Sequence, residues 1–191
     1  MIVGRWEPGA ADRITDAAIE LFRERGFEGT TTAAIAERAG VTRRTFFRYF
    51  GDKRDVIFVE HSRLAETVAA VMSVAPPGSA AIEIISTALH RLATDIFEGH
   101  RDRVRGLHLL IVSDEALRER EQLKNALIAD AAERSLVERG FSQFDARLAA
   151  GVGVLALSLA IERWIDDDAS DLVAITDSVL ASIGSLTSGG P

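Results

Sequence analysis

The chain has 191 residues, 47% of them hydrophobic and 27% charged, and its 22 Lys and Arg against 29 Asp and Glu give a formal net charge of −7. These proportions exclude a disordered chain and a fibrous repeat. The sequence contains no cysteine, which excludes disulfide bonds, thiolate metal sites and cysteine nucleophiles. The length suits one large domain or a small domain joined to a larger one.

Signals for export or membrane insertion are weak in this sequence. Residues 1–8 show no basic stretch followed by an apolar core, so we expect no signal peptide. The longest uncharged apolar run, residues 148–161, has 14 residues, fewer than the roughly 18 that suggest a membrane span. We therefore predict a cytoplasmic protein with no membrane partner.

Helical spacing of apolar residues dominates the chain, and no convincing alternation indicates a strand. A first helix is predicted over 14–25. The threonines at 30–32 can cap a short second helix that ends at Gly40. A third short helix is predicted over Arg43–Phe50, with Thr42 as its N-cap. The beginning of the chain therefore consists of three short helices joined by tight turns.

The rest of the chain is also predicted to be helical. A long fourth helix extends from Asp52 to about Met72, and a connector rich in proline and glycine follows at 75–79. The fold class is therefore all-α, with about nine helices. The last five are expected over 82–96, 100–113, 114–139, 142–166 and 172–186.

Positive charge is concentrated in one segment of this acidic chain. Residues 30–54 contain six Lys and Arg against two acidic residues. A compact basic face on an acidic body suits a phosphate-bearing partner such as nucleic acid. The alternative is an ordinary solvated surface, and the charges by themselves favour neither interpretation.

Residues 35–42 have the features of the turn in a helix-turn-helix motif. Ala36 and Ala39 are small, so two helices can cross closely there. Gly40 permits a positive φ in the turn. Thr42 can cap the next helix, whose N-terminal backbone N–H groups favour a phosphate. The sequence therefore predicts a helix-turn-helix between residues 32 and 50.

The helix after that turn carries side chains suited to the major groove of DNA. An exposed arginine can bond two acceptors on guanine, and Thr45 can contact a thymine methyl group. Phe46 and Phe50 lie four residues apart and are expected to face the core. Ordinary surface charge remains the alternative for the arginines. The candidate DNA contacts from this reasoning are Arg43, Arg44, Thr45, Phe47 and Arg48, with Lys53 placed to reach a phosphate.

The stretch from Gly26 to Lys53 resembles the DNA-binding domain of TetR-family transcriptional regulators, over about residues 10–58. The resemblance implies a homodimer that binds a double-stranded DNA operator through residues 1–55. It implies that residues 56–191 bind a small-molecule effector and form the dimer interface, and that the protein is a repressor released by that effector. It also implies phosphate contacts from Thr31, Thr42 and Lys53. The family often has Tyr at position 47 and His at position 48, where this chain has Phe and Arg.

One helix of the body has a nearly flat face. Ala149, Gly153, Ala156 and Ala160 follow a spacing of four, three and four residues, which allows another helix to approach closely. Core packing within the chain is the alternative. Together with the resemblance to the TetR family, this pattern implies that this helix and residues 172–186 of two protomers form a four-helix bundle across a two-fold axis. The predicted interface residues are Ala149, Val152, Gly153, Ala156, Ala160, Ile175, Val179 and Ile183.

The effector site is the least specified part of the sequence. Candidates lie on the helices where members of the family build their pocket, and each has ordinary core or surface packing as the alternative. The segment Ala146–Asp166, with residues 44–50, resembles an actinobacterial branch of the family that includes the mycofactocin-system regulator. This resemblance favours an apolar or acylated effector. The candidate effector contacts are Phe58, His61, Met72, His90, Phe97, Arg105 and His108.

Catalytic patterns are absent from the sequence. It has no His-Glu-x-x-His pair, Gly-rich phosphate loop or nucleophile elbow, so we predict neither an enzyme nor a cofactor. Asp166–Asp168 is interpreted as a solvated turn rather than a metal site. A ligand-independent dimeric DNA-binding regulator and a transcriptional activator of the same fold remain the alternatives.

Overall fold

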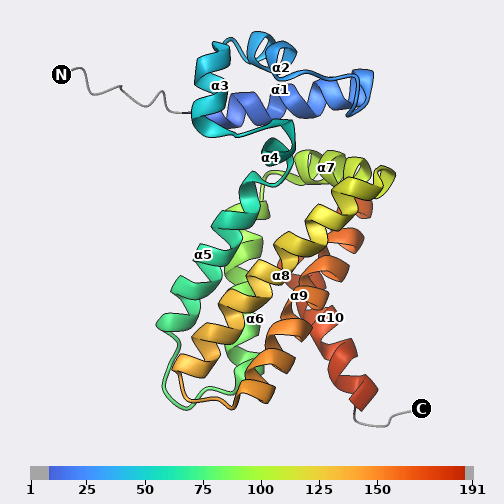
Figure 1. Ribbon diagram of the computed structural model, residues 1–191. Coiled ribbons are helices and arrows are strands. Elements are labelled where there is room, and N and C mark those ends of the chain that lie inside the picture. Colours follow the sequence, from blue (N-terminus) through green and yellow to red (C-terminus); the bar gives the residue numbers. More distant parts are fainter. Residues whose placement is uncertain (1–8, 188–191) are drawn as a thin grey trace, which may run out of the picture. The chain divides into compact units, whose positions relative to one another are not determined.

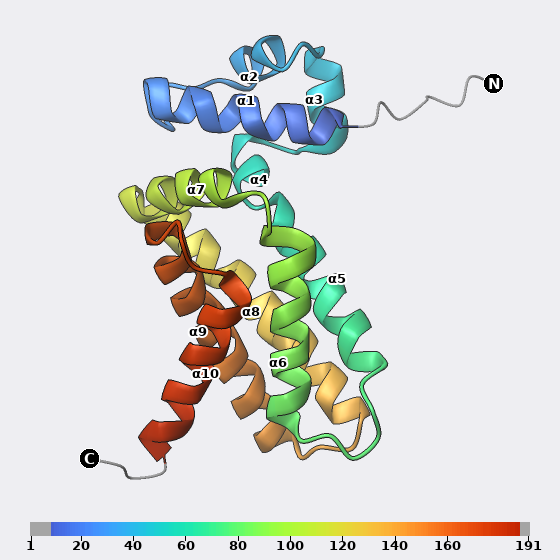
Figure 2. The same cartoon turned by 180° about the vertical axis from the view of Figure 1, so that it is seen from behind.

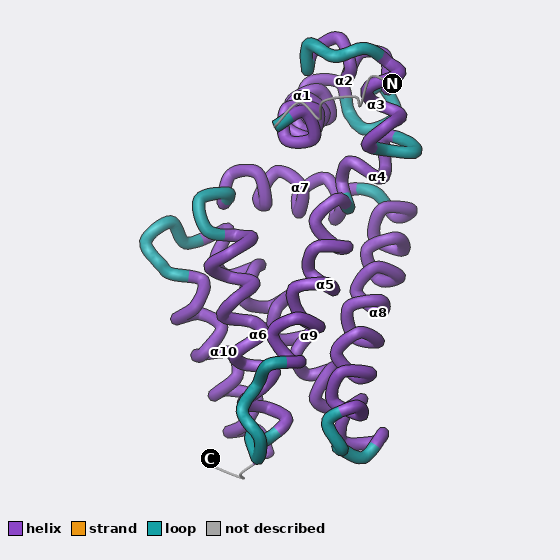
Figure 3. Tube along the Cα trace, turned by 90° about the vertical axis from the view of Figure 1, so that its left-hand side faces the viewer, coloured by secondary structure: helices purple, strands orange, loops and turns teal. Residues whose placement is uncertain are grey.

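The computed structural model describes residues 9–187, without the side chains of residues 59–63 and 187. This part of the chain forms ten α-helices and one π-helical segment, and it contains no strand (Figure 3). The predicted all-α class is therefore confirmed. The chain divides into two compact units, one comprising residues up to Val59 with Gly106–Arg118, and the other comprising Glu60–Arg105 with the residues from Glu119 onward.

The first unit contains the predicted helix-turn-helix (Figure 1). Phe46, Ile14 and Ile35 are fully buried in its core. Ile111 and Leu117, far along the chain, pack into the same core, whereas the sequence analysis placed one domain boundary after residue 55. The helices of this unit are α1 (Ala10–Arg25), α2 (Thr32–Arg38), α3 (Arg43–Tyr49) and α4 (Lys53–Ile57), with the later part of α7 (Arg101–Ser113) and the start of α8 (Glu115–Glu138).

The single fourth helix expected from Asp52 to Met72 is interrupted in the structure. Helix α4 ends at Ile57 and α5 (Val59–Ser73) begins after Phe58, whose φ of −107° and ψ of 17° lie outside the helical region. The Phe58 side chain is buried in the core of the first unit. Burial of this aromatic ring offsets the broken helical turn.

The second unit is a bundle in which α9 packs against both α6 and α10 (Figure 2). Its core is a continuous apolar cluster that includes Met72, Leu92 and Leu136. The remaining elements of this unit are α5, α6 (Ala81–Leu92), the π-helical segment η1 (Ala93–Phe97), α9 (Gln143–Asp166) and α10 (Leu172–Thr187), together with most of α8.

One arginine closes an end of this bundle. Arg139, after α8, donates from Nη1 to the carbonyl oxygen of Met72 at 3.1 Å and from Nη2 to that of Ala75 at 2.6 Å. These acceptors lie where α5 ends and its last carbonyl groups have no partner within the helix. Arg139 therefore fixes the beginning of the connector between α5 and α6.

Among the described helices, α9 is long and apolar enough to cross a membrane by length and composition alone. The core helices of soluble proteins pass the same test. Nine residues of α9 are buried inside the second unit, including Ala156, Ala160 and Trp164. Packing within the protomer therefore accounts for the apolar residues on one side of this helix.

Candidate functional site

The turn between α2 and α3 has the geometry that the sequence predicts. Thr31 caps α2 by accepting a hydrogen bond from the backbone N–H of Ala34 at 3.2 Å. Thr42 caps α3 in the same way, with Thr45 as the donor at 3.1 Å. Between them Gly40 adopts a φ of +66°. The predicted capping residues and the predicted glycine turn are therefore confirmed.

Helix α3 has one apolar face and one polar face. Phe46 is completely buried, and its ring lies 5.7 Å from that of Phe50. Arg43 and Arg44 are exposed and have no hydrogen-bonding or ion-pairing partner among the described residues. Phe47 is 48% exposed and packs edge-on against Phe46. The packed aromatic face thus holds a cationic face toward solvent.

Arg48 completes this outer face of α3. Its side chain is exposed, and its guanidinium carbon lies 5.0 Å from the centre of the Tyr49 ring. A cation above an aromatic face loses some conformational freedom but keeps its charge. Arg48 therefore adds a third cation to the surface formed by Arg43 and Arg44, which we call the arginine face of α3.

Arg38 does not add to the arginine face, although it belongs to the same basic segment. It pairs with Glu24 at 2.9 Å and with Glu20 at 3.1 Å, both on α1. Hydrogen bonding with Glu24 raises the pKa of Arg38 and lowers the pKa of Glu24. The charge of Arg38 is thus offset by α1, and this contact joins α1 to α2.

Lys53 is turned inward, although the sequence analysis expects it at a phosphate. Its ammonium group donates to the carbonyl oxygens of Phe27 at 2.7 Å and Thr30 at 3.2 Å. It also lies 4.3 Å from the centre of the Phe27 ring, and only 19% of the side chain is exposed. In this arrangement Lys53 connects the start of α4 to the loop between α1 and α2.

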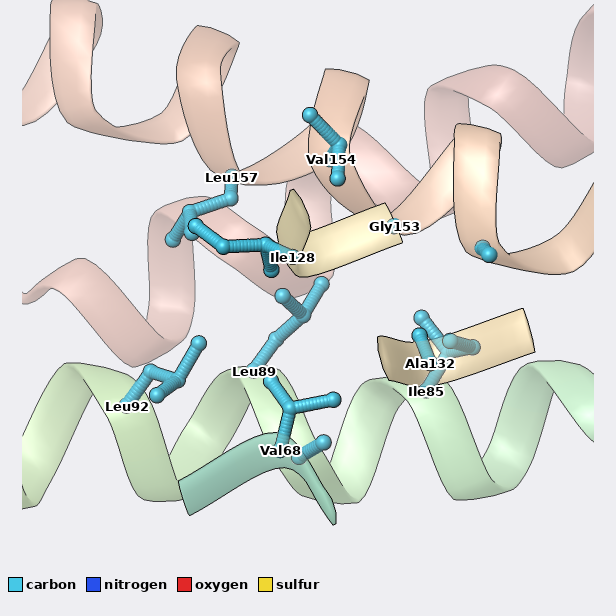
Figure 4. Close-up of a pocket in the computed structure, with 11 residues that line it drawn as sticks. Val68, Ile85, Leu89, Leu92, Ile128, Ala132, Gly153, Val154 and Leu157 are labelled. Carbon is cyan, nitrogen blue, oxygen red and sulfur yellow. The ribbon is translucent and has the colours of Figure 1, made fainter. Parts of the chain in front are cut away.

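An apolar cavity lies inside the second unit, between α5, α6, α8 and α9. In Figure 4, Leu89 of α6 and Leu157 of α9 point into the space between their helices. The cavity measures about 20 Å³, room for about one water molecule, and its apolar walls offer no hydrogen bonds to hold one. It is lined by Val68, Ile85, Ala88, Leu89, Leu92, Ile128, Ala132, Ala150, Gly153, Val154 and Leu157.

None of the predicted effector contacts that the structure describes lines this cavity. Phe97 and Met72 are buried elsewhere in the core of the second unit, and Phe58 is buried in the first. His90 bonds to Oδ1 of Asp177 at 2.7 Å. The three other candidates have these places: Arg105 bonds to the carbonyl oxygen of Ile165, His108 belongs to the first unit, and the side chain of His61 lies outside the described residues.

The flat face of α9 is turned into its own protomer, which corrects its assignment to the dimer interface. Ala156 and Ala160 are completely buried, and Ala149 is 9% exposed. A Cβ atom on Gly153 would lie 2.9 Å from Cγ2 of Ile85, so this face serves the close approach of α6. The other four predicted interface residues are placed as follows: Ile175 and Val179 are buried in the core, and Val152 and Ile183 are partly buried.

The outward face of α9 is apolar as well. Leu148 is 58% exposed, Leu155 52% and Leu159 39%. Their spacing of seven and four residues places them on one side of the helix. We call these three residues the leucine stripe of α9. Sequence reasoning singled out the small-residue face of this helix but left open whether that face packs within the chain or against a partner.

The acidic run at the end of α9 is engaged by arginines. Asp168 accepts a hydrogen bond from Arg105 at 2.6 Å, and this bond lowers the pKa of Asp168. A side-chain hydrogen bond from Ser170 lowers the pKa of Asp167. Over the residues that the structure describes, no group of three or more His, Asp or Glu could hold a metal ion.

Comparison with known proteins gives consistent results. The sequence pattern of the family described as bacterial regulatory proteins, tetR family, matches residues 14–58. The chain is 28% identical over 185 residues to the HTH-type transcriptional regulator TcmR of Streptomyces glaucescens, which covers 92% of this chain and 81% of TcmR. It also resembles a solved structure of Thermus thermophilus FadR, a TetR-family transcriptional repressor in complex with lauroyl-CoA. That similarity has a TM-score of 0.52 at 26% identity and covers 90% of this chain and 91% of the other.

The similarity to the mycofactocin branch is partial. A mycofactocin biosynthesis transcriptional regulator of Mycobacterium tuberculosis, MftR, is 43% identical over 54 residues, which are 28% of this chain and 27% of MftR. A match of that length cannot include both residues 44–50 and residues 146–166. The resemblance to this branch therefore does not extend over the body of the protein. All these relatives are transcriptional regulators, a class of binding proteins rather than enzymes.

Proposed function

The chain belongs to the TetR family of bacterial transcriptional regulators, and from this premise we propose that it is a cytoplasmic homodimeric repressor that a small apolar or acylated effector releases from a palindromic operator. The observation that carries the DNA-binding part is the arginine face of α3, which is exposed and supported from behind by the buried ring of Phe46. Each further part of the proposal has its own structural support.

DNA recognition is assigned to the first unit. With α3 in the major groove, Arg43, Arg44 and Arg48 can reach base edges or phosphates, and a bidentate contact to guanine discriminates by about 1–3 kcal/mol. The cap at Thr31 leaves its hydroxyl hydrogen available to a phosphate oxygen, and the hydroxyls of Thr42 and Thr45, which lie 3.0 Å apart, together keep one hydrogen available, while the short helices present further N–H groups. Two such units about 34–36 Å apart would match one turn of DNA.

Dimerisation is assigned to the leucine stripe of α9. Leu148, Leu155 and Leu159 are exposed in the protomer, and the family of this chain typically forms dimers. Pairing of α9 with the same helix of a second protomer, with α10 alongside, would bury the stripe. Each Å² of apolar surface removed from water would stabilise the dimer by about 25 cal/mol. This assignment replaces the small-residue face, which the core of the protomer already uses.

The effector is assigned to the apolar cavity of the second unit. FadR of Thermus thermophilus, 26% identical to this chain, binds lauroyl-CoA in its solved structure. The entirely apolar lining here suits an alkyl chain, but a volume of about 20 Å³ does not hold one. Binding therefore requires the lining helices to separate. The small volume also favours a second candidate function, a DNA-binding regulator that responds to no ligand.

The DNA-binding part is tested by selecting bound fragments from the source genome and measuring affinity for the consensus at several salt concentrations. A protein that neutralises phosphates loses affinity steeply as salt increases. We expect Arg44→Ala to weaken the consensus selectively by about 1–3 kcal/mol. The matched control is Arg134→Ala, which removes the same charge from an exposed position on α8 and should leave affinity unchanged. Affinity that does not depend on salt would contradict the proposal.

The dimer and effector parts have separate tests. Leu155→Glu should convert the dimer to a monomer by light scattering, whereas Leu123→Glu, at a 69% exposed position on α8, should leave the mass unchanged. For the effector, calorimetric titration with lauroyl-CoA should show binding, and lauroyl-CoA should release the consensus duplex. Unimpaired DNA binding without any response to lauroyl-CoA or to shorter and longer acyl-CoA probes would favour the ligand-independent regulator.

A further inference from the structure

Helix α7 is divided between the two units of the chain. Its residues 106–113 belong to the first unit, and its residues 101–105 belong to the second. In the first unit α7 is held by apolar packing, with Ile111 buried in the core. In the second unit Val104 is the α7 residue that packs against the apolar core, and it is only partly buried. Polar contacts must therefore supply most of the attachment on that side.

Arg101 provides the first of these contacts. Its Nη1 donates to the carbonyl oxygen of Asp167 at 2.8 Å, and its Nη2 donates to that of Ser170 at 2.5 Å. The guanidinium carbon also lies 4.7 Å from the centre of the Trp164 ring. One side chain thus binds the end of α9 and the turn that leads to α10.

Arg105 binds the same turn one helical turn later. Its Nε donates to the carbonyl oxygen of Ile165 at 2.6 Å, and its Nη2 donates to Oδ1 of Asp168 at 2.6 Å. Its Nη1 bonds to Asp102 at 3.0 Å on its own helix, which fixes the orientation of the guanidinium plane. We call Arg101 and Arg105, with the turn 165–170 that they bind, the arginine clamp.

One acceptor of the clamp, the carbonyl oxygen of Ile165, belongs to the last turn of α9, and the others follow directly after the helix in the turn 167–170. The last carbonyl groups of a helix have no partner within it and carry the negative end of its dipole. Guanidinium groups satisfy them with charge-assisted bonds, which are roughly twice as strong as neutral ones. Such bonds depend on direction and distance, so the start of α7 must follow the position of the carboxyl end of α9.

Helix α9 therefore has three features along its length. Ala150, Gly153, Val154 and Leu157 line the apolar cavity, the leucine stripe lies on the outward face, and the clamp holds the carboxyl end. A ligand larger than the cavity must displace one of the lining helices. Displacement of α9 moves the carbonyl groups that Arg101 and Arg105 hold.

We propose that Arg101 and Arg105 are positioning residues that transmit effector binding in the cavity, through α7, to the DNA-binding unit. The proposal rests on the proposed function, because it takes the cavity as the effector site and α3 as the DNA-reading helix. The clamp contacts neither DNA nor effector, and it acts by tying the start of α7 to α9. Loss of the clamp leaves the effector site and the DNA-reading helix intact. It weakens the effect that a bound effector has on the affinity for the operator.

The first test compares Arg105→Met with Arg91→Met. The methionine keeps part of the apolar stem and removes the guanidinium. Arg91 is a matched control, because it pairs with Asp95 at 2.8 Å one turn away and its side chain is 59% exposed. The measurement is the ratio of operator affinities without and with lauroyl-CoA, together with lauroyl-CoA affinity by calorimetry.

We expect the unmodified chain to give a ratio of about 5–150. Arg105→Met should lower this ratio at least about twofold, while lauroyl-CoA affinity and dimer mass stay the same and Arg91→Met behaves as the unmodified chain. Asp168→Asn keeps the Arg105 bond to Ile165 and should give a smaller decrease. A ratio in Arg105→Met equal to that of the unmodified chain overturns the proposal.

The second test needs neither DNA nor effector. Hydrogen exchange at the backbone amides of residues 106–113 should become faster in Arg105→Met and stay unchanged in Arg91→Met, because the start of α7 has lost its anchor. Unchanged exchange overturns the proposal whatever the ligand does. Faster exchange in a protein that binds no acyl-CoA supports the clamp and contradicts only the effector part of the proposed function.

Discussion

Helix α3 of the first unit and the bundle of the second unit use arginine side chains in opposite ways. On the first, the cations of α3 point outward, and Arg43 and Arg44 have no partner among the described residues. In the second, Arg105 and Arg139 are bound to carbonyl groups of the protein itself, and the cavity has only apolar walls. In the proposed function, the groups that would contact a polyanion therefore lie on the surface, whereas the space for an apolar molecule lies within the packed bundle.

The largest expected effect tests how far the arginine face of α3 depends on the apolar residues that pack behind it. Phe46→Ala should cost about 3–5 kcal/mol of unfolding free energy, because a completely buried ring is removed from a packed core. Chemical denaturation followed by circular dichroism measures this change. Phe47→Ala, at the exposed neighbouring ring, is the control and should cost much less. Similar losses for both variants would contradict the two-faced description of α3.

A pair of glycine variants tests the inward face of α9. Gly151→Ala meets no atom within 4 Å and should stabilise the protein by about 0.5–1 kcal/mol through helix propensity. Gly153→Ala places a Cβ 2.9 Å from Ile85 and forces that side chain to shift, an overpacking that typically costs about 1–3 kcal/mol. Thermal unfolding should therefore separate the two variants.

The two glycine variants also test whether the cavity is the effector site. Ile85 lines the cavity beside Gly153, so its shift takes up the space that an alkyl chain would need. We expect Gly153→Ala to weaken lauroyl-CoA binding in calorimetry while Gly151→Ala leaves it unchanged. Dimer mass should stay the same in both. Monomers in Gly153→Ala would return the small-residue face to the dimer interface.

Lys53 shows that a cation on the first unit can also be used internally. Lys53→Met keeps the length of the side chain and removes two bonds to carbonyl groups, and a hydrogen bond to a charged group contributes a net stabilisation of about 1.5–3 kcal/mol. We expect a lower thermal midpoint and an unchanged salt dependence of DNA affinity. A decrease of about one unit in the salt slope would instead assign Lys53 to a phosphate.

The smallest effect concerns pH and the turn after α9. Arg105 lowers the pKa of Asp168 from its ordinary value of 3.8, so the ionised form is favoured in the folded protein. Such a carboxylate stabilises the fold above its unfolded pKa, and this contribution is lost as pH decreases through the folded pKa. The stability difference between the unmodified chain and Asp168→Asn should therefore be present at neutral pH and shrink below about pH 4. A difference that does not depend on pH would contradict the role of this charge.

Local signals made the first unit predictable from sequence. A threonine cap and a glycine with positive φ depend on residues two to four positions apart, so Thr31, Gly40 and Thr42 could be assigned without knowledge of the fold. The break at Phe58 could not, because it depends on a core to which α7 and α8 contribute from far along the chain.

The second unit was less predictable because its signals are ambiguous. A small-residue stripe permits close packing with a helix of the same chain or of a partner, and only the position of α6 decided for Gly153. Arg105 was a candidate effector contact because it lies on a helix where members of the family build their pocket. Its bond to the carbonyl group of Ile165 depends on where α9 ends relative to α7, which no short motif encodes.

The hold of Arg139 on the end of α5 has a practical consequence for labelling this protein. Because Met72 and Ala75 are fixed by that side chain, the rest of the connector, around Gly78, is separated from the bundle by an anchored segment. Exposed loop tips of this kind accept insertions well. A fluorescent tag inserted after Gly78 should therefore leave the end of α5 in place.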